Sequence, residues 1–206
     1  ARVVNVDASE ALALRGVKAV VTGTDIPGKK YGFFRSRRDE TGIATTARYI
    51  GDPVAAVAAI DEETAIEALD LIKVDYEELP PVFEIKDALA KGAPVIHETS
   101  PGNMSIDRKI QYGSIQKGFA EADYVREDVF TVHAVSPAYL EPCSSIARCE
   151  IDGRITLWTS TQVPYIVQCL LASTLNMREN DIRVIKPAVG GGFGGKMELR
   201  PWEFCA

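Results

Sequence analysis

The sequence predicts an α+β protein in two parts, and three observations support this expectation. An apolar run at residues 54–60 is followed by a helical stretch and then by another strand at 73–76. Asp152-Gly153 lies between two strand-like runs, which is typical of a hairpin. A stretch rich in Pro, Gly, Asn and Ser at 98–114 separates the halves, as a linker does. With 206 residues, 46% of them hydrophobic, the chain is long enough for one or two domains.

Four strands are expected in the first hundred residues. Residues 2–6 show a strand-like alternation, and residues 17–21 are expected to form a buried strand. Residues 54–60 are continuously apolar, which suggests a strand covered on both faces. Residues 73–76 predict the fourth strand, which the prolines that follow would end.

The helix between the third and fourth strands is expected to begin after Asp61. This carboxylate can accept from free N–H groups of the first helical turn. Ile66, Leu69 and Ile72 would form the apolar stripe of the helix. Because these patterns are complete, we expect residues 1–98 to fold as a unit that is more stable than the remainder.

The second half is expected to contain the hairpin, a helix and one further strand. Residues 147–151 and 154–158 would pair across a two-residue type I′ turn. Pro164 suits the first turn of a helix that runs to about Met177. Residues 181–186 again predict a strand.

Charge and cysteine usage exclude several classes of protein. The net charge of −6 argues against nucleic acid, and the basic cluster Arg35–Arg38, followed by acidic residues, is expected to be a solvated loop. No apolar run reaches the roughly 20 residues of a membrane helix, and no secretory leader is visible. The four cysteines form no C-x-x-C pair, so we expect reduced thiols in a cytoplasmic protein and neither a zinc knuckle nor an iron–sulfur cluster. Both ends look cut, so we treat the chain as a piece of a longer protein.

The glycine run at 190–196 is the strongest candidate for a functional site. Five of the six positions from Gly190 to Gly195 lack a Cβ, so backbone N–H groups could approach a ligand closely. The frame Gly190, Gly192, Gly195 also fits the G-x-G-x-x-G fingerprint of dinucleotide sites. Cofactor contact, a dinucleotide site and a merely mobile turn all stay open, and Lys196 at the edge of the run is expected to meet solvent.

Gln162 is the second candidate, because it lies where a strand ends and a helix begins. Its amide there could donate to an oxygen ligand and accept from a backbone N–H. The alternative is that Ser160 or Thr161 caps the helix and Gln162 is solvated.

Three further features have weaker functional interpretations. Glu141 could be a ligand or an acid–base group, but a surface carboxylate before a proline turn is favoured. His97 and His133 lack metal-ligand spacing and are expected to be ordinary histidines. Residues 48–53 require a turn, and we expect their role to be structural.

Taken together, these segments resemble the xanthine dehydrogenase and aldehyde oxidase family of molybdenum hydroxylases. Residues 48–57, Arg-Tyr-Ile-Gly-Asp-Pro-Val-Ala-Ala-Val, look like the signature of its α/β hammerhead domain, which residues 72–80 continue. Residues 161–165, Thr-Gln-Val-Pro-Tyr, and residues 183–187 before the glycine run look like the start of its molybdopterin-binding domain.

The resemblance implies a domain organisation. A hammerhead domain would span residues 1–98 and a linker residues 99–124, before the N-terminal part of a molybdopterin-binding domain at 125–206. The two short motifs Gly-Asp-Pro and Thr-Gln-Val-Pro-Tyr look most like the large subunit of 4-hydroxybenzoyl-CoA reductases. The Gly-Gly-Lys ending of the run is closer to members that oxidise xanthine or aldehydes, and Pro137 stands where the family often has His.

The resemblance also implies a chemistry. The parent protein would be an oxidoreductase that hydroxylates or reductively dehydroxylates an aromatic, heterocyclic or aldehyde substrate. Its cofactor would be molybdenum on molybdopterin, in the dinucleotide form. Gln162 would hydrogen-bond an oxygen ligand of the metal, and the cofactor would lie against Gly192, Phe193, Gly194 and Gly195. The general-base Glu of the family would lie beyond the C-terminus.

The same resemblance suggests partners. Iron–sulfur clusters and FAD would be carried by partner subunits of a heteromeric complex, with the FAD subunit optional. A different class of function stays open: a non-catalytic binding or assembly module that shares the hammerhead fold. A full reading frame several hundred residues longer, with a late Glu, would favour the enzyme.

Overall fold

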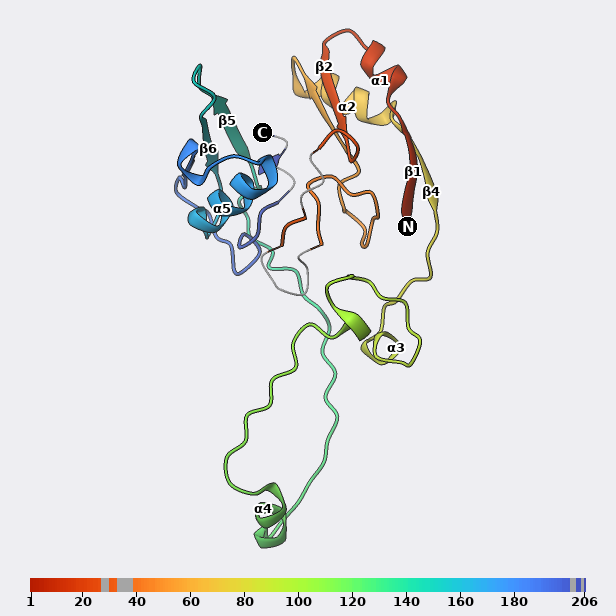
Figure 1. Ribbon diagram of the computed structural model, residues 1–206, viewed down its shortest axis with the longest axis vertical. Coiled ribbons are helices and arrows are strands. Elements are labelled where there is room, and N and C mark those ends of the chain that lie inside the picture. Colours follow the sequence, from red (N-terminus) through yellow and green to blue (C-terminus); the bar gives the residue numbers. More distant parts are fainter. Residues whose placement is uncertain (27–29, 33–38, 201–202, 205) are drawn as a thin grey trace.

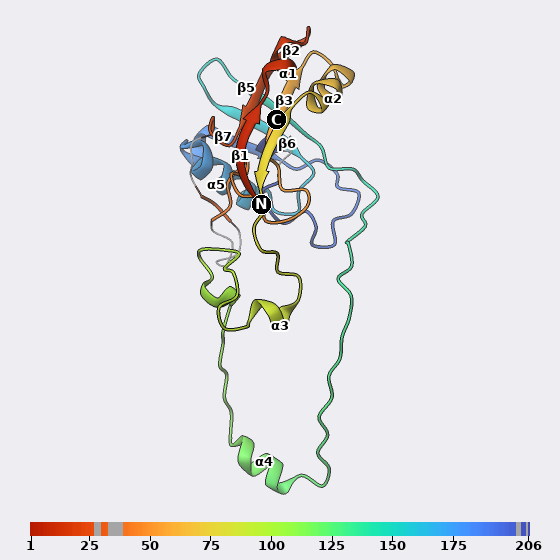
Figure 2. The same ribbon diagram turned by 90° about the vertical axis from the view of Figure 1, so that its right-hand side faces the viewer.

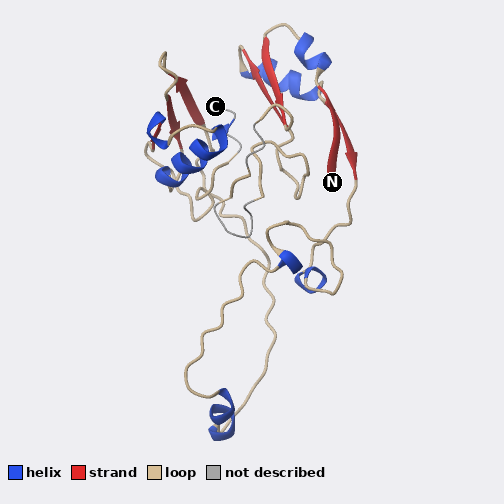
Figure 3. Cartoon of the chain, in the orientation of Figure 1, coloured by secondary structure: helices blue, strands red, loops and turns tan. Residues whose placement is uncertain are grey.

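The protein is an α+β structure of two lobes and a long arm (Figure 1, Figure 3). The computed structural model describes residues 1–206 except 27–29, 33–38, 201–202 and 205. The basic cluster Arg35–Arg38 therefore lies outside the described residues. The strands are β1 (Arg2–Asp7), β2 (Val17–Thr22), β3 (Ala55–Ala59), β4 (Lys73–Glu77), β5 (Ser145–Cys149), β6 (Ile155–Thr159) and β7 (Ile182–Ile185). The helices are α1 (Ser9–Ala13), α2 (Glu62–Asp70), α3 (Ile85–Ala88), α4 (Ile115–Glu121) and α5 (Pro164–Leu175), with 3-10 turns η2 (Pro101–Asn103) and η3 (Glu179–Asp181).

The N-terminal lobe, residues 1–98, contains two antiparallel pairs of strands. β1 pairs with β4 and β2 pairs with β3, while α1 and α2 contact each other and the β2–β3 pair. All four strands predicted from the sequence are present. The expectation that β3 is covered on both faces is wrong, because none of its residues is fully buried. A pair of strands with helices against it leaves the other face open.

Helix α2 begins as predicted but turns a different face inward. Asp61 Oδ1 accepts a hydrogen bond from the backbone N of Thr64 at 2.8 Å, which confirms the cap. Ile66 and Leu69 of the expected apolar stripe are exposed, whereas Ala68 is fully buried. The small alanine side chain lets the helix lie close to its neighbours α1 and β3. The face of α2 that is buried is therefore the one that lets the helix approach α1 and β3 closely, and not the one with the largest apolar side chains.

The turn at residues 48–53 is present and is part of a hydrogen-bonded cluster around Asp39. Arg48 N donates to Asp52 Oδ2 at 2.9 Å, and Asp52 N donates to the carbonyl of Tyr49. The Arg48 guanidinium also pairs at 3.0 Å with Asp39, whose side chain has no exposed surface. His97 Nδ1 lies 2.8 Å from the other oxygen of Asp39. Burial raises the pKa of Asp39, but the hydrogen bond from His97 and the charge of Arg48 together lower it by more. The net pKa is below its usual value, so the carboxylate stays ionised.

The C-terminal lobe, residues 139–206, contains the main hydrophobic core. Its sheet has the order β5–β6–β7, with β6 antiparallel to β5 and parallel to β7. Helix α5 connects β6 to β7 and begins at Pro164 as predicted. The buried core consists of Leu157, Val167, Leu171, Ala172, Ile182 and Leu199. The buried apolar residues of the N-terminal lobe are three alanines and Ile43, so this lobe buries less apolar side-chain volume than the C-terminal lobe. Burial therefore does not support the expectation that residues 1–98 are the more stable part.

The β5–β6 hairpin has a longer turn than predicted. Glu150 N donates to the carbonyl of Arg154 at 2.8 Å, and Gly153 N donates to the carbonyl of Glu150 at 2.9 Å. Gly153 has φ +82°, so the loop has three residues with glycine in the left-handed region. The hairpin is confirmed, but the two-residue type I′ turn is wrong.

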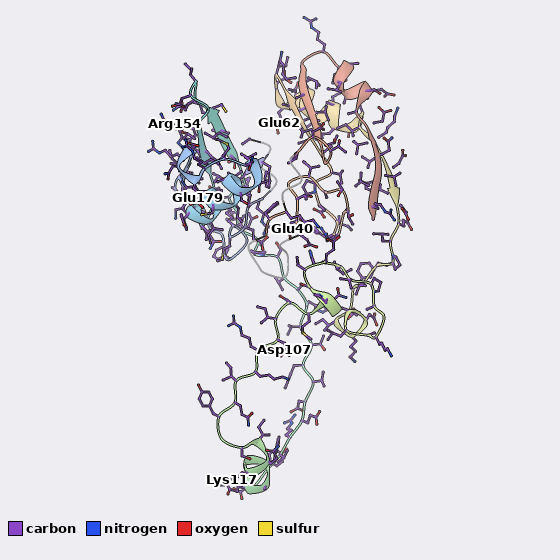
Figure 4. The ribbon with its side chains drawn as sticks, viewed as in Figure 1. Glu40, Glu62, Asp107, Lys117, Arg154 and Glu179 are labelled. Atoms are coloured by element: carbon purple, nitrogen blue, oxygen red, sulfur yellow. The ribbon has the colours of Figure 1, made fainter. Side chains whose placement is uncertain are left out.

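The arm, residues 104–138, leads away from both lobes and carries α4 at its tip (Figure 2). Every residue of the arm is exposed. Lys117 marks the tip, far from the labelled side chains of the two lobes (Figure 4). Among the described residues, no helix is long and apolar enough to cross a membrane.

Candidate functional site

Three segments far apart in the sequence meet in the C-terminal lobe. They are residues 139–141 at the base of the arm, residues 160–162 between β6 and α5, and the glycine run 190–196 after β7. Because β6 and β7 are parallel, their carboxyl ends lie at one edge of the sheet. This edge is the usual place for a ligand in an open sheet with helical crossovers. The two candidates that the sequence suggested, Gln162 and the glycine run, are therefore neighbours.

Gln162 is attached to the glycine run through both its backbone and its side chain. Its backbone N donates to the carbonyl of Lys196 at 2.9 Å. Its Oε1 accepts from the backbone N of Gly194 at 3.1 Å and of Lys196 at 3.2 Å. These two donors fix the sense of the amide, because only an oxygen can accept them. The Nε2 group then faces away from the run and makes no hydrogen bond with any described residue.

The alternative in which Ser160 or Thr161 caps the helix is wrong. Helix α5 has no side-chain cap at its N-terminus. Ser160 Oγ donates to Glu141 Oε2 at 2.8 Å, and Thr161 Oγ1 donates to the carbonyl of Lys196 at 3.2 Å. Thr161 Oγ1 also accepts from the backbone N of Val163 at 3.1 Å, but Val163 precedes the first helical residue, so this bond satisfies none of the free N–H groups of the helix. Both hydroxyls therefore tie the end of β6 to the other two segments. Gln162 is exposed, but its carbonyl end is held by the run.

Three of the glycines are required by side chains of the protein itself. A Cβ at Gly190 would lie 2.8 Å from Glu141 Cβ, and one at Gly195 would lie 2.7 Å from Tyr139 Cε1. A Cβ at Gly192 would lie 2.5 Å from Gln162 Oε1. Such distances are too short for any carbon contact. These glycines allow the run to lie directly on Glu141, Tyr139 and Gln162.

The tip of the run is different, because it is open and has unusual backbone angles. Gly191 and Gly194 have φ of +94° and +87°, and Phe193 has φ +48° with an exposed ring. A positive φ in a bulky residue is strained, and such strain is concentrated at functional sites. A Cβ at Gly194 would meet nothing within 4 Å. The backbone N–H groups of Gly191, Gly192 and Phe193 donate to no described residue; Gly192 is buried, whereas Gly191 is partly exposed and Phe193 is exposed.

Two of the three interpretations of the glycine run are now weaker. A dinucleotide fingerprint requires a helix directly after the glycines, and residues 190–200 contain none. The dinucleotide fingerprint is therefore wrong here. A merely mobile turn does not fit either, because the run is bonded to Gln162 and Glu141 and closed by a 2.7 Å bond from Gly195 N to the carbonyl of Gly192.

Glu141 and Lys196 form an ion pair next to the run, in which only the Lys196 side chain is fully buried. Lys196 Nζ lies 2.5 Å from Glu141 Oε2 and 2.8 Å from Ser160 Oγ, with the ring of Tyr139 at 4.6 Å. Lys196 is 1% exposed, so the expectation that it meets solvent is wrong. Glu141 is half-buried and also accepts from Gly190 N at 2.7 Å, so the favoured interpretation as a surface carboxylate is wrong as well. Hydrogen bonds from Lys196, Ser160 and Gly190 lower the pKa of Glu141 to about 2.

Other candidates lie outside this site. His133 is exposed on the arm, and His97 belongs to the hydrogen-bonded cluster around Asp39. No group of three or more His, Cys, Asp and Glu residues among the described residues is arranged to hold a metal ion. A cavity of about 410 Å³ lies beside Arg48, His97 and Arg200, but neither Gln162 nor the glycine run lines it.

Comparisons with known proteins agree with this arrangement. Residues 1–80 match the model of the aldehyde oxidase and xanthine dehydrogenase a/b hammerhead domain, and residues 96–206 match that of the molybdopterin cofactor-binding domain. The chain belongs to the xanthine dehydrogenase and aldehyde oxidase family. This family assignment and the α+β fold predicted from the sequence are therefore confirmed.

Relatives within the family are similar along the whole chain. The chain is 33% identical over 206 residues to the nicotinate dehydrogenase large molybdopterin subunit of Eubacterium barkeri, covering 100% of the chain and 48% of that protein. It is 33% identical over 207 residues to the xanthine dehydrogenase of Dictyostelium discoideum, covering 100% and 14%. Quinoline 2-oxidoreductase of Pseudomonas putida 86 superposes with a TM-score of 0.86 at 32% identity, covering 98% and 27%. The chain thus spans about half the length of the first of these relatives and less of the other two.

The family model of the second domain begins at residue 96, whereas we expected a linker at 99–124 and the domain from 125. These boundaries stay a prediction. Sequence reasoning missed Lys196, Ser160 and Tyr139 as members of the site. Lys196 directly after the glycines and Glu141 before a proline were the available signals, but nothing local indicated that the two side chains pair.

Proposed function

We propose that the edge formed by Gln162 and the tip of the glycine run holds a molybdopterin-type cofactor in a molybdenum-dependent oxidoreductase. The observation that carries the proposal is the amide of Gln162. Its oxygen accepts from Gly194 and Lys196, so its Nε2 donors are left without a partner among the described residues, on a side chain that is exposed. A fixed donor of this kind suits an oxygen acceptor on a bound group.

The residues present fit such a group. Gly194 leaves space on its open side, and the free N–H groups of Gly191, Gly192 and Phe193 can receive oxygen or sulfur atoms that carry negative charge. No protein carboxylate, thiolate or imidazole cluster competes for the metal among the described residues. A metal brought in by its own organic ligand needs no such cluster. The pterin is proposed to be the dinucleotide form, and Gly192, Phe193, Gly194 and Gly195 are the proposed contact residues together with Gln162.

When bound, the cofactor supplies two-electron transfer and the exchange of an oxygen atom with the substrate. The residues of this chain would orient the cofactor through hydrogen-bond donors. Gln162 Nε2 would donate to an acceptor oxygen of the group, and the exposed ring of Phe193 would be available for contact with it. The backbone N–H donors orient the group without adding a titrating side chain. A general-base Glu is proposed to come from a part of the protein beyond residue 206.

The substrate is proposed to be an aromatic heterocycle or an aldehyde, hydroxylated at carbon. Relatives named for nicotinate, xanthine and quinoline support the heterocyclic class. The alternative proposal is the reverse type of reaction, reductive dehydroxylation of an aromatic substrate such as 4-hydroxybenzoyl-CoA, and it rests on the Gly-Asp-Pro and Thr-Gln-Val-Pro-Tyr motifs. We propose an iron–sulfur partner subunit, an optional FAD subunit and a cytoplasmic location. The partner cofactors would carry the electrons away.

The test uses the full-length protein that contains this chain. Purified protein is expected to hold molybdenum and a pterin in equal amounts, measured by elemental analysis and by fluorescence of the oxidised pterin. Turnover is then measured with an oxidised dye as electron acceptor on nicotinate, xanthine, quinoline and an aromatic aldehyde, and with a reduced dye as electron donor on 4-hydroxybenzoyl-CoA. The 206-residue chain alone is expected to show no turnover above a Gln162→Ala control. Full-length protein without metal, pterin or turnover would support a non-catalytic binding or assembly module instead.

A further inference from the structure

We propose that Lys196 is a positioning residue, and that the ion pair of its buried ammonium group with Glu141 sets the geometry in which Gln162 and the glycine run meet their ligand. The identity of that ligand rests on the proposed function, but the geometry does not. The Lys196 side chain has no exposed surface, whereas Gly194 and the ring of Phe193 are exposed.

Lys196 connects all three segments of the site. Its ammonium group holds Glu141 in the first segment and Ser160 in the second. Its backbone N donates to Gln162 Oε1, and its backbone carbonyl accepts from the backbone N of Gln162. One residue therefore fixes both ends of Gln162 and anchors the run to the base of the arm.

Glu141 extends the same connection to the start of the run. Its Oε2 accepts from Gly190 N at 2.7 Å as well as from Lys196 and Ser160. The run is thus held at Gly190 through Glu141 and at Gly194 through Gln162. The Lys196 side chain contacts the group that holds Gly190, and the Lys196 backbone contacts the group that holds Gly194.

The ammonium group acts through these neighbours rather than on the ligand. Its three N–H donors face Glu141 Oε2 at 2.5 Å, Ser160 Oγ at 2.8 Å and the carbonyl of Glu141 at 3.4 Å. The side chain has no exposed surface. No donor is left for a group at the open face.

Because the Lys196 ammonium group is buried and Glu141 is half-buried, the pair is expected to be sensitive to the loss of one partner and more tolerant to the loss of both charges. An ammonium or a carboxylate left alone in a buried site is strongly unfavourable, whereas neutral side chains of similar shape can replace a buried pair at little cost. A variant that lacks both charges can therefore fold while lacking the ion pair, so an effect on positioning can be measured apart from an effect on folding. Lys196→Met/Glu141→Gln removes both charges, keeps an acceptor for Gly190 N and Ser160, and loses the ion pair.

The test compares this double variant with Lys196→Met and with Lys186→Met in the full-length protein. Lys186 is an exposed lysine just after β7, so Lys186→Met is a matched control for the loss of a lysine near the site. Hydrogen exchange is followed by mass spectrometry in peptides covering residues 160–163, 190–196 and the core helix α5. Molybdenum content and turnover per bound molybdenum are measured on the same samples.

We expect the double variant to exchange like wild type in α5 but about tenfold faster at 190–196, the effect of losing one charge-assisted hydrogen bond. Its molybdenum content should fall, and turnover per bound molybdenum should fall while KM changes little. Lys196→Met should be worse on every measure, and Lys186→Met should match wild type. If Lys196→Met does not accumulate, the double variant alone decides.

Wild-type exchange at 190–196 in the double variant, together with wild-type molybdenum content, would overturn the proposal, because the pair would then only balance charge. Faster exchange spread equally over α5 would also overturn it, because the role would be general stability. If the wild-type protein holds no molybdenum, the proposed function fails, while the exchange pattern still tests the positioning role.

Discussion

Gly192→Ala is the most direct test of how the run and Gln162 depend on each other. The added methyl carbon would lie 2.5, 2.7 and 2.9 Å from Oε1, Cδ and Cγ of Gln162. The backbone has little freedom to retreat, because Gly192 is buried and its carbonyl accepts from Gly195 N at 2.7 Å. The Gln162 side chain must therefore rotate away. Gly194 N and Lys196 N then lose their acceptor.

The size of the effect follows from these two hydrogen bonds. Each contributes about 1 kcal/mol net, so local opening of the run becomes easier by about 2 kcal/mol. That corresponds to roughly thirtyfold faster hydrogen exchange at the two amides. If Nε2 also donates to a reacting group, its displacement lowers turnover by about a hundredfold.

The assay is hydrogen exchange of a peptide covering 190–196, with molybdenum content and turnover measured beside it. Gly118→Ala serves as a control, because its Cβ would meet nothing within 4 Å and its φ is ordinary. In a Gln162→Ala background the same Gly192→Ala change has no side chain to displace, so its additional effect should be small. Wild-type exchange in Gly192→Ala, or equal effects in both backgrounds, would refute the reasoning.

Four further results are expected. Gln162→Ala should keep its molybdenum but lose about a hundredfold in turnover per bound metal, and loss of the metal would contradict this. Gly194→Val should abolish metal content, because a β-branched residue disfavours a φ of +87° and fills the open face, whereas Gly194→Asn should retain more of it; equal metal content in both would count against the assignment of this face. Since the pKa of Glu141 is lowered from its usual 4.5 to about 2, its contribution to holding the run should be complete above pH 4.5 and lost as the pH falls towards 2, so a transition in the exchange of the run near neutral pH would be inconsistent with it. Amides of β6 should exchange more slowly than those of β3, because β6 has a partner strand on each side and lies in the main core, and the reverse order would restore the expectation of a more stable N-terminal lobe.

The features that the sequence predicted correctly depend on local chemistry. Asp61 caps α2 through the backbone of Thr64, three residues away, and Pro164 starts α5 because its ring already has a helical φ. The strands follow from apolar runs and turn residues of the same kind. The buried face of α2 was not predictable in this way, because Ala68 is buried through its contact with elements that are distant in sequence.

The site shows the same division between local and distant causes. That Gln162 would accept from the backbone could be proposed from its place at a strand end, but its donors, Gly194 and Lys196, come from 32 and 34 residues further on. The ion pair joins residues 55 positions apart. No spacing rule relates such residues, because the relation is created by the parallel pairing of β6 and β7. A lysine beside glycines therefore looked like a solvated loop edge until the fold was known.

The glycine run also shows why a count of glycines overstates a ligand site. Gly190, Gly192 and Gly195 are explained by the close approach of Glu141, Gln162 and Tyr139, so a larger residue at these positions damages the protein before any ligand is considered. A valine at Gly192 would abolish activity whether or not a cofactor touches that residue. Gly194 is different, because its open side faces no protein atom within 4 Å. Substitutions there report on what occupies that space, and they are the ones that can separate a cofactor contact from an internally packed turn.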